Sequence, residues 1–376
     1  MALEFGLFNS GCVLPQWAAD KARPEHQRLM DEVALVQAGD RSGFKYTWVT
    51  EHHFLTEYSH LSASEVFLGY LAHATSRIHI GSGIFNITPP VNHPARIAER
   101  VAMLDHLSQG RFEFGMGRGS STTEQAGFGI TEPELTREMF DEVVGEFRSM
   151  WKDDEYAGHK GEHFNMPVRN VLPKPFTNPH PPMWVAAGSP STFEKAARMG
   201  LGVLCFTLGD VEQLKPLIEI YKTTIQGCDP VGEYVNDNIM VTSQLLCLED
   251  GQRVRDIAPT LAGGYQSSLL FRYLDTFPRP EGVPVWPDLI PESGRADFEA
   301  AIENRTLCYG TPDEVAESVK RYEAAGVDQL VFGMLSSAMS GEVAIESADT
   351  FGKFVIPQFD TDPLHRTARM REAQSV

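Results

Sequence analysis

Apolar residues recur along this chain with two spacings, one typical of buried strands and the other of amphipathic helices. Short runs rich in β-branched and aromatic residues predict eight strands. Apolar positions three and four residues apart predict helices in the segments between them. We expect the strands at residues 4–9, 46–50, 78–86, 111–117, 183–188, 203–206, 239–248 and 329–334.

Several of the expected helices have marked ends. A helix at 92–110 can be capped by Asn92 or His93, and the proline that follows suits its first turn. The next helical pattern opens with Thr131 and Glu134 at the spacing of a capping box and continues to Trp151. Further helical patterns lie at 24–42, 62–75, 311–326 and 342–354.

Eight strands that alternate with helices predict an α/β fold, and we expect a (β/α)8 TIM barrel. A doubly wound sheet would also alternate strands with helices, but the count of eight and the polar motifs at several strand ends favour the barrel. We expect a single domain over residues 1–376, with insertions after strand 4 (120–182) and after strand 7 (251–306). Because long unpatterned segments in a compact domain are usually functional, 251–306 is interpreted as a mobile active-site loop region.

Composition narrows the function classes. The net charge of −19, from 32 basic and 51 acidic residues, argues against a nucleic-acid-binding protein, which needs a basic surface. The five cysteines are scattered without a C-x-x-C pair, so neither a disulfide framework nor a zinc site is indicated. No apolar run is long enough to span a membrane and the N-terminus lacks a signal-peptide pattern, so we expect a cytoplasmic protein.

The two histidines of "EHHF" (51–54) follow directly on the second strand, at the end where a barrel carries its active site. In extended backbone His52 and His53 point to opposite sides, which makes joint chelation of one metal awkward. No carboxylate or cysteine stands at a ligand-like spacing, so no metal site is predicted. Two interpretations stay open: ordinary structural histidines, or one histidine at the barrel mouth as an acid, base or hydrogen-bond donor.

The glycine-rich segment "GMGRGS" (115–120) follows the fourth strand. Its glycine spacing is G-x-G-x-G rather than the G-x-G-x-x-G of dinucleotide-binding folds, and no apolar helix start follows, so that function is rejected. The segment is either a tight turn with a surface arginine or a loop that lets a ligand approach the backbone, with Arg118 suited to phosphate.

The segment "GSPST" (188–192) follows the fifth strand and opens a helix. Ser189 is the natural N-cap, and capping alone would explain the motif. Ser191 and Thr192, however, add hydroxyl groups at the positive end of a helix, which is typical of an anion site. Because strands 4 and 5 are neighbours in a barrel, Arg118 and this helix start could bind one phosphate together.

Three segments, in the same order along the chain, resemble the luciferase-like monooxygenase family, the flavin-dependent barrels that include bacterial luciferase. They are "EHHF", "NHPARIAERVAMLDHLSQGRFEFGMGRG" and "WVAAGSPSTFEKAARMG". The resemblance covers most of residues 3–210 and the eighth strand–helix unit. The combination of motifs is specific, whereas each motif by itself is not.

The resemblance implies a role for each motif in binding FMN. His52 would assist the chemistry at the flavin C4a position, and Gly117 would lie near the reactive edge of the isoalloxazine ring, where bacterial luciferase has a bulkier side chain. The third strand would carry a bulge with a non-proline cis peptide beneath the flavin, which we place at Phe85–Asn86, with Asn86 among the cofactor-binding residues. The FMN phosphate would be held by Arg118, Arg137, Gly188, Ser189, Ser191 and Thr192.

The activity that the resemblance implies is that of a flavin-dependent monooxygenase. Reduced FMN from a separate flavin reductase would react with O2 to a C4a-peroxyflavin, which would insert one oxygen atom into a small, largely apolar organic substrate. The loop region 251–306 would keep water away, and four of its aromatic residues either form the pocket wall or only pack the loop: Phe271, Tyr273, Phe277 and Trp286. The family often pairs barrels through helices, so a homodimer through residues 95–107 is expected.

Three alternatives compete with this assignment. One is an F420-dependent oxidoreductase that transfers hydride without oxygen, against which "EHHF" and "SPST" favour FMN. Another is a non-catalytic flavin-binding protein, against which the intact His52 and Arg118 count. The third is a barrel hydrolase with paired carboxylates, which fits least because the strand ends offer glycines, hydroxyl groups, histidine and arginine.

Overall fold

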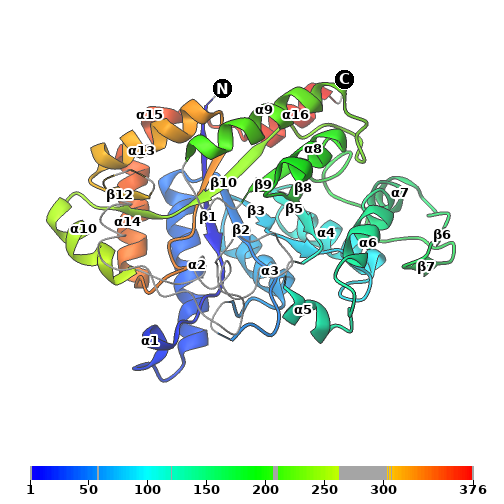
Figure 1. Cartoon of the computed structure of the whole chain (residues 1–376), viewed down its shortest axis with the longest axis horizontal. Helices are drawn as coiled ribbons and strands as arrows, with labels where there is room; N and C mark the ends of the chain where they lie inside the picture. Colours follow the sequence, from blue (N-terminus) through cyan, green and yellow to red (C-terminus); the bar gives the residue numbers. More distant parts are fainter. Residues whose placement is uncertain are drawn as a thin grey trace.

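Eight parallel strands close into a barrel (Figure 1) in the computed structural model, which describes residues 2–56, 59–119, 121–205, 211–261, 303, 305 and 307–374. The barrel strands are β1 (Glu4–Asn9), β2 (Tyr46–Val49), β3 (His79–Ser82), β5 (Phe112–Gly117), β8 (Met183–Ala186), β9 (Gly202–Cys205), β10 (Ile239–Ser243) and β13 (Gln329–Phe332). Neighbours follow the order β3-β2-β1-β13-β10-β9-β8-β5, and the pairing of β3 with β5 closes the ring. The predicted (β/α)8 barrel is confirmed.

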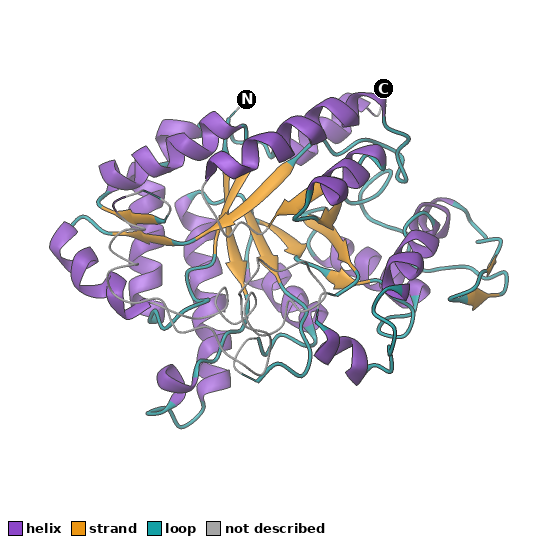
Figure 2. Cartoon of the chain, viewed as in Figure 1, coloured by secondary structure: helices purple, strands orange, loops and turns teal. Residues whose placement is uncertain are grey.

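Helices form the outer layer around the strands (Figure 2). They include α2 (Pro24–Ser42), α3 (Ser64–Ala74), α4 (Pro94–Leu107), α8 (Pro190–Arg198), α9 (Leu214–Thr224), α13 (Pro312–Ala325) and α14 (Gly341–Phe354). Short helices add α1 (Pro15–Ala18), η1 (Val211–Gln213), η2 (Ile225–Gly227), α15 (Ile356–Phe359) and α16 (Arg366–Gln374). No helix in the described part of the chain is long and apolar enough to cross a membrane.

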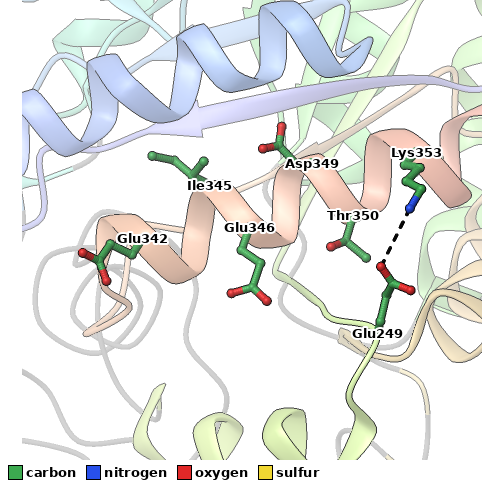
Figure 3. A pocket seen from close by; sticks show the side chains of 7 residues that line it. All are labelled: Glu249, Glu342, Ile345, Glu346, Asp349, Thr350 and Lys353. Carbon is green, nitrogen blue, oxygen red and sulfur yellow. Dashed lines mark ion pairs between the residues drawn. The ribbon is translucent and has the colours of Figure 1, made fainter.

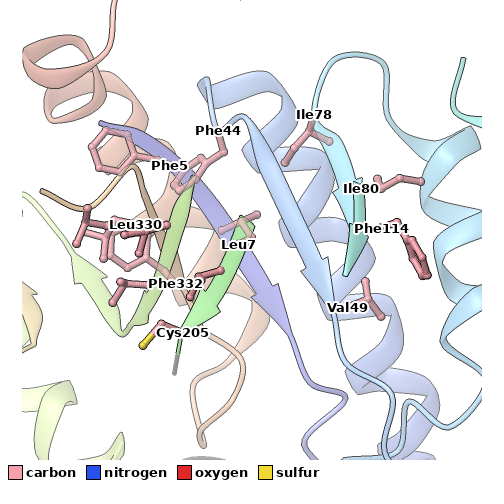
Figure 4. Close-up of a cluster of buried hydrophobic side chains, with 14 of the residues drawn as sticks. Phe5, Leu7, Phe44, Val49, Ile78, Ile80, Phe114, Cys205, Leu330 and Phe332 are labelled. Atoms are coloured by element: carbon pink, nitrogen blue, oxygen red, sulfur yellow. The ribbon is translucent and has the colours of Figure 1, made fainter. Parts of the chain in front are cut away.

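Two apolar cores lie on the two faces of the sheet, because successive strand residues point to opposite sides. The larger core fills the space between strands and helices and includes Phe5, Ile80 and Phe332 (Figure 4). Inside the barrel, Trp48 and Trp184 meet edge to face with ring centroids 5.2 Å apart. The interior is therefore filled with side chains, and a ligand must bind beyond the strand ends.

The third and seventh predicted strands are each interrupted. Residues 78–86 form β3 and then β4 (Phe85–Asn86), with a cis peptide bond between Gly83 and Ile84. The predicted position of that bond, Phe85–Asn86, is wrong, because β4 already pairs in register with the last residues of β5 and the bulge precedes it. Residues 239–248 form β10 and then β11 (Leu245–Cys247), which leaves the barrel to pair with β12 (Cys308–Gly310).

The insertion after β5 holds three helices and a hairpin among its described residues: α5 (Thr122–Gly127), α6 (Leu135–Val143), α7 (Glu146–Lys152), β6 (His159–Lys160) and β7 (Asn165–Met166). The single helix and the capping box predicted from Thr131 and Glu134 are wrong, since α6 begins after Glu134 and that side chain makes no capping bond. The N–H groups of Leu135 and Arg137 instead bond carbonyl groups three residues back, which satisfies them without a side-chain cap.

The insertion after β10 is described only in part. Its first residues form α10 (Gly251–Ile257) and η3 (Ala258–Leu261). Residues 262–302, 304 and 306 lie outside the described residues, and so do the aromatic residues proposed for the pocket wall, Phe271, Tyr273, Phe277 and Trp286. The role of 251–306 as an active-site loop region stays a prediction.

Candidate active site

The end of β2 carries His52, whose ring is bound by a carboxylate from the neighbouring insertion. Nδ1 of His52 lies 3.1 Å from Oε1 of Glu124, and the same oxygen accepts the N–H of His53 at 2.8 Å. Glu124 lies in the first turn of α5, where the hydroxyl of Ser121 caps the helix. The side chains of His52 and Glu124 are 14% and 9% exposed, so the ring is largely buried and its orientation is set by this contact.

His53 binds a different carboxylate. Its Nε2 lies 3.4 Å from Oε1 of Glu51, which also accepts a hydrogen bond from Nδ2 of Asn92 at 3.0 Å. Burial raises the pKa of Glu51, and the contact with His53 opposes the rise. The two histidines thus point to separate partners, and no group of three or more His, Cys, Asp and Glu side chains in the described residues is arranged to hold a metal ion.

Arg118 stands directly after the last residue of β5, and its guanidinium is partly buried. Its Nη1 donates a hydrogen bond to Oγ1 of Thr136 in α6 at 2.8 Å. Burial lowers the pKa of Arg118, the charge of Arg137 lowers it further and the charge of Glu134 opposes the decrease, so all three charged groups act on the same region. Arg137 is 62% exposed and only 4.0 Å from a carboxylate oxygen of Glu134. Among the described residues Arg118 forms no ion pair, and this is the charge pattern of an anion site.

The start of α8 adds hydroxyl groups to this positive region. Ser189 caps the helix, and its Oγ lies 3.0 Å from Oγ1 of Thr192 and 3.2 Å from Oγ of Ser191. Both Gly188 and Ser189 donate their N–H groups to Oγ1 of Thr192, at 3.1 and 2.9 Å. A Cβ atom at Gly188 would meet nothing within 4 Å, so open space lies beside this turn.

Strand pairing and a helix contact bring the two halves of the cationic site together. β5 and β8 are paired in parallel, so Arg118 and the start of α8 follow the same ends of adjacent strands. An ion pair between Lys195 and Asp141 joins α8 to α6 one turn after Ser191 and Arg137. We call Arg118, Arg137, Ser189, Ser191 and Thr192 the cationic site.

Asn86 and Gly117, the remaining predicted cofactor residues, face each other in the pairing of β4 with β5. A Cβ atom at Gly117 would lie 2.7 Å from Cδ1 of Ile84, so glycine makes room for the residue that follows the cis peptide. Oδ1 of Asn86 accepts hydrogen bonds from the N–H and Oγ1 of Thr88, at 3.0 and 2.7 Å. Asn86 therefore shapes its own loop, and its contact with a cofactor stays a prediction.

Two carboxylates of the site, Glu51 and Glu124, were not among the residues predicted to act. Glu51 belongs to the "EHHF" motif, but only its burial and its contact with Asn92 show that it holds the loop. Ser121 and Glu124 have the S-x-x-E spacing that marks a helix start, which could have revealed α5. That spacing does not reveal the contact with His52, 72 residues earlier in the chain.

A surface hollow of about 570 Å³ lies apart from these residues, on the outer helix α14 (Figure 3). Its lining is mostly acidic and comprises Glu249, Glu342, Ile345, Glu346, Asp349, Thr350 and Lys353. Glu249 and Lys353 form a loose ion pair at 3.9 Å. None of the predicted site residues lines this hollow, so it is not the candidate site.

Comparisons with known proteins agree with the barrel fold. The sequence model of a family described as luciferase-like monooxygenase matches residues 4–329. The oxygenase component of a flavin-dependent trigonelline monooxygenase from Acinetobacter baylyi is 26% identical over 356 residues, which cover 90% of this chain and 92% of the relative. The structure of the monooxygenase RslO1 from Streptomyces bottropensis has a TM-score of 0.75 and 25% identity, and covers 95% of this chain and 100% of its own.

A fold likeness extends to enzymes that use another cofactor. An F420-dependent secondary alcohol dehydrogenase has a TM-score of 0.70 at 18% identity, with 96% of this chain and 100% of that chain covered. At this identity the likeness shows the shared barrel. It leaves the choice of cofactor to the residues at the strand ends.

Proposed function

Because this chain belongs to the luciferase-like monooxygenase family, we propose that it binds reduced FMN and uses O2 to insert one oxygen atom into a small organic substrate. Its relatives include flavin-dependent monooxygenases, so the chain is an oxidoreductase of the monooxygenase type. The observation that carries a phosphate-bearing flavin is the charge of Arg118, which forms no ion pair among the described residues, at a strand end next to the one whose helix opens with hydroxyl groups.

The cationic site fits a phosphate group. Arg118 and Arg137 supply charge, and Ser189, Ser191 and Thr192 supply hydroxyl donors at the positive end of a nine-residue helix. The open space beside Gly188 leaves room for the phosphate to approach the backbone. Gly117 and Asn86, at the paired ends of β4 and β5, would then lie along the flavin ring.

Bound reduced FMN would supply the activation of O2 and the transfer of one oxygen atom. The chain's own contribution would come from His52, which holds or moves a proton at the reacting centre. Glu124 would keep the His52 ring in one orientation through the contact at Nδ1. Loop region 251–306 would exclude water, and a largely apolar substrate would bind beneath it.

Two partners belong to this proposal. A separate flavin reductase would supply reduced FMN, and a second copy of the chain would pack against α3 and α4 to form a homodimer in the cytoplasm. These two helices contact each other and expose four large apolar side chains, Val66, Tyr70, Met103 and Leu107. Replacing Met103 and Leu107 with aspartate should shift the mass measured by light scattering from dimer to monomer, and an unchanged mass would exclude this face.

The central test is a choice between two reduced cofactors. We expect the purified protein to bind reduced FMN in an anaerobic titration, and then to place one atom of 18O2 in the product when mixed with substrate and oxygen. Tight binding of reduced F420 without binding of reduced FMN would instead assign the chain to hydride transfer. Binding of FMN without any oxygen transfer to a panel of apolar and heteroaromatic substrates would favour a non-catalytic flavin protein.

A further inference from the structure

Two charged residues of α2, Arg28 and Glu32, are fully buried beneath the loops that follow β1 and β13. The guanidinium of Arg28 lies 4.0 Å from the ring centre of Trp17 and points two nitrogens at the carbonyl groups of Ser337 and Met339, at 3.3 and 3.4 Å. Burying a charge is costly unless it is bonded, so such residues commonly hold a particular arrangement of the chain.

Glu32 holds the loop after β1. Its Oε1 accepts the N–H of Gly11 at 2.8 Å. Gly11 has a φ of +58°, and a Cβ atom there would lie 2.8 Å from Cγ of Leu61. The loop after β1 is therefore pressed directly against the segment that follows the "EHHF" motif, with no room for a side chain between them.

From Gly11 a chain of hydrogen bonds leads to His52. The carbonyl of Gly11 accepts the N–H of His60 at 3.0 Å, and the carbonyl of the next residue, Leu61, accepts the N–H of His52 at 3.2 Å. The backbone of His52 is thus held from one side through Glu32, and its ring from the other side by Glu124.

We propose that Glu32 is a positioning residue that holds the backbone of His52 through Gly11 and the 60–61 segment. The proposal rests on the proton-handling role proposed for His52 as far as activity is concerned. Glu32 touches neither cofactor nor substrate in this scheme. Its carboxylate fixes where the loops after β1 and β2 meet. It thereby fixes the position of the backbone that carries the His52 ring.

The charge state of Glu32 gives this arrangement a pH dependence. Burial raises the pKa of Glu32 to about 7, while the charge of Arg28 and the N–H groups of Gly11 and Ser10 oppose the rise and the charge of Asp31 adds to it. A thiol, that of Cys12, also lies near Arg28. Above pH 7 the ionised carboxylate accepts the N–H of Gly11 in a charge-assisted bond, which is stronger than the bond to a neutral carboxyl.

The test compares Glu32→Gln with Asp31→Asn, which removes a neighbouring charge on α2 that bonds Gln27 within the helix and no loop residue that the structure describes. Hydrogen–deuterium exchange of the flavin-free proteins at pH 8 should be faster in peptides covering 9–14 and 50–61 of Glu32→Gln. Exchange in α3 should not change, and Asp31→Asn should match the wild type. The kcat of oxygen transfer should fall about 3- to 30-fold in Glu32→Gln at pH 8, and less at pH 6, with the Kd for reduced FMN unchanged.

Global stability should move the other way. Because the folded-state pKa lies above the usual 4.5, the stability that Glu32 contributes is lost as pH rises from 4.5 to 7, and glutamine escapes this loss. The melting temperature of Glu32→Gln relative to wild type should therefore rise from pH 5 to pH 8, and an unchanged relative melting temperature would overturn the pH dependence.

Unchanged exchange in both peptides overturns the positioning role. Should Glu32→Gln fail to fold, Glu32→Asp replaces it: its shorter carboxylate reaches the N–H of Gly11 less well, so the same peptides should exchange faster than in wild type at pH 8, and equal rates overturn the proposal. The exchange measurement needs no flavin. A wild type without oxygen transfer would therefore refute the proposed function, and only the exchange result would refute the path from Glu32.

Discussion

The ends of β2 and of β5 both carry ionisable side chains, and the two regions differ in how those side chains are paired. At the end of β2 the histidines and carboxylates bind each other, His52 with Glu124 and His53 with Glu51. At the end of β5 Arg118 bonds only a hydroxyl among the described residues, and Arg137 is mostly exposed. The carboxylates of the first region bind side chains of the chain itself, whereas Arg118 in the second forms no ion pair among the described residues, which leaves its charge available to an anionic ligand.

The difference is informative because acidic residues are in excess. The chain has 51 acidic and 32 basic residues, so a carboxylate partner for Arg118 would be easy to supply. Instead, Arg118 bonds the hydroxyl of a threonine, and a second arginine opposes its charge while Glu134 acts on it without an ion pair. The hydroxyl-rich start of α8 follows the neighbouring strand. A region that orients a reactive side chain closes on itself, and a region that binds an anion keeps its positive charge open.

The largest effect is expected at His52, in the region after β2. Replacing His52 with alanine should lower kcat for oxygen transfer by about 100-fold or more, because proton transfer by a positioned side chain typically contributes this much. Flavin affinity should not change, since the cationic site is intact. Single-turnover assays with pre-bound reduced FMN measure the first effect, and an anaerobic titration measures the second.

His53 is the matched control for that variant. It follows His52 directly, but its ring binds Glu51 and contacts Phe128 edge to face at 4.8 Å. Its N–H to Glu124 belongs to the backbone and survives substitution. We expect His53→Ala to keep oxygen transfer within about threefold of wild type. An equal loss in both variants would contradict the separate roles.

The region at the end of β5 is tested with substitutions of its two arginines. Arg118→Ala should weaken reduced FMN binding about tenfold to hundredfold, the usual range for a charge-assisted hydrogen bond in a partly buried place. Arg137→Ala should weaken it by at most about fivefold, because an exposed charge is screened by solvent. Isothermal titration at low and high salt distinguishes them, since the smaller effect should disappear at high salt. Equal losses would show that burial does not rank the two.

Much of the barrel could be predicted because its elements carry local signals. Helix α2 has the predicted bounds, Pro24–Ser42, since a proline suits its first turn and Gly43 ends it with a φ of +96°. The start of α6 could not be predicted in this way. Its first N–H groups donate to backbone carbonyls. The capping-box spacing of Thr131 and Glu134 therefore does not determine where the helix begins.

The site shows the same division. The hydroxyl groups of "SPST" and the charge of Arg118 are visible in the sequence, because they depend on residue type at a strand end. The contact of His52 with Glu124 depends on how α5 is oriented after β5, and the place of the cis peptide depends on the register of β4 against β5. Both are tertiary facts, which a local pattern does not contain.

A smaller effect in the region after β2 is expected from a substitution of Glu124. Glu124→Gln keeps the shape of the side chain but exchanges the charged acceptor for a neutral amide, so the His52 ring should be held less firmly. We expect kcat to fall about 3- to 10-fold, the usual effect of weakening one such bond. The control is Glu132→Gln in the exposed part of the same insertion, which should behave like wild type. A change in flavin affinity larger than the change in kcat would place Glu124 with the cationic site instead.

The smallest expected effect distinguishes a carboxylate, which can be protonated, from a guanidinium, which stays charged. Burial raises the pKa of Glu51 and lowers that of Arg118, but a guanidinium stays charged in proteins whereas a carboxyl can be neutral. Since the folded-state pKa of Glu51 lies above the usual 4.5, its contribution to stability is lost as pH rises through that folded value. Glutamine cannot ionise, so the melting temperature of Glu51→Gln relative to wild type should rise as the pH increases above 4.5. Exposed Glu132→Gln should show no such trend. A relative melting temperature that falls instead would mean that the bonds of ionised Glu51 to His53 and Asn92 outweigh the cost of its burial. The charges at the end of β2 would then stabilise the fold.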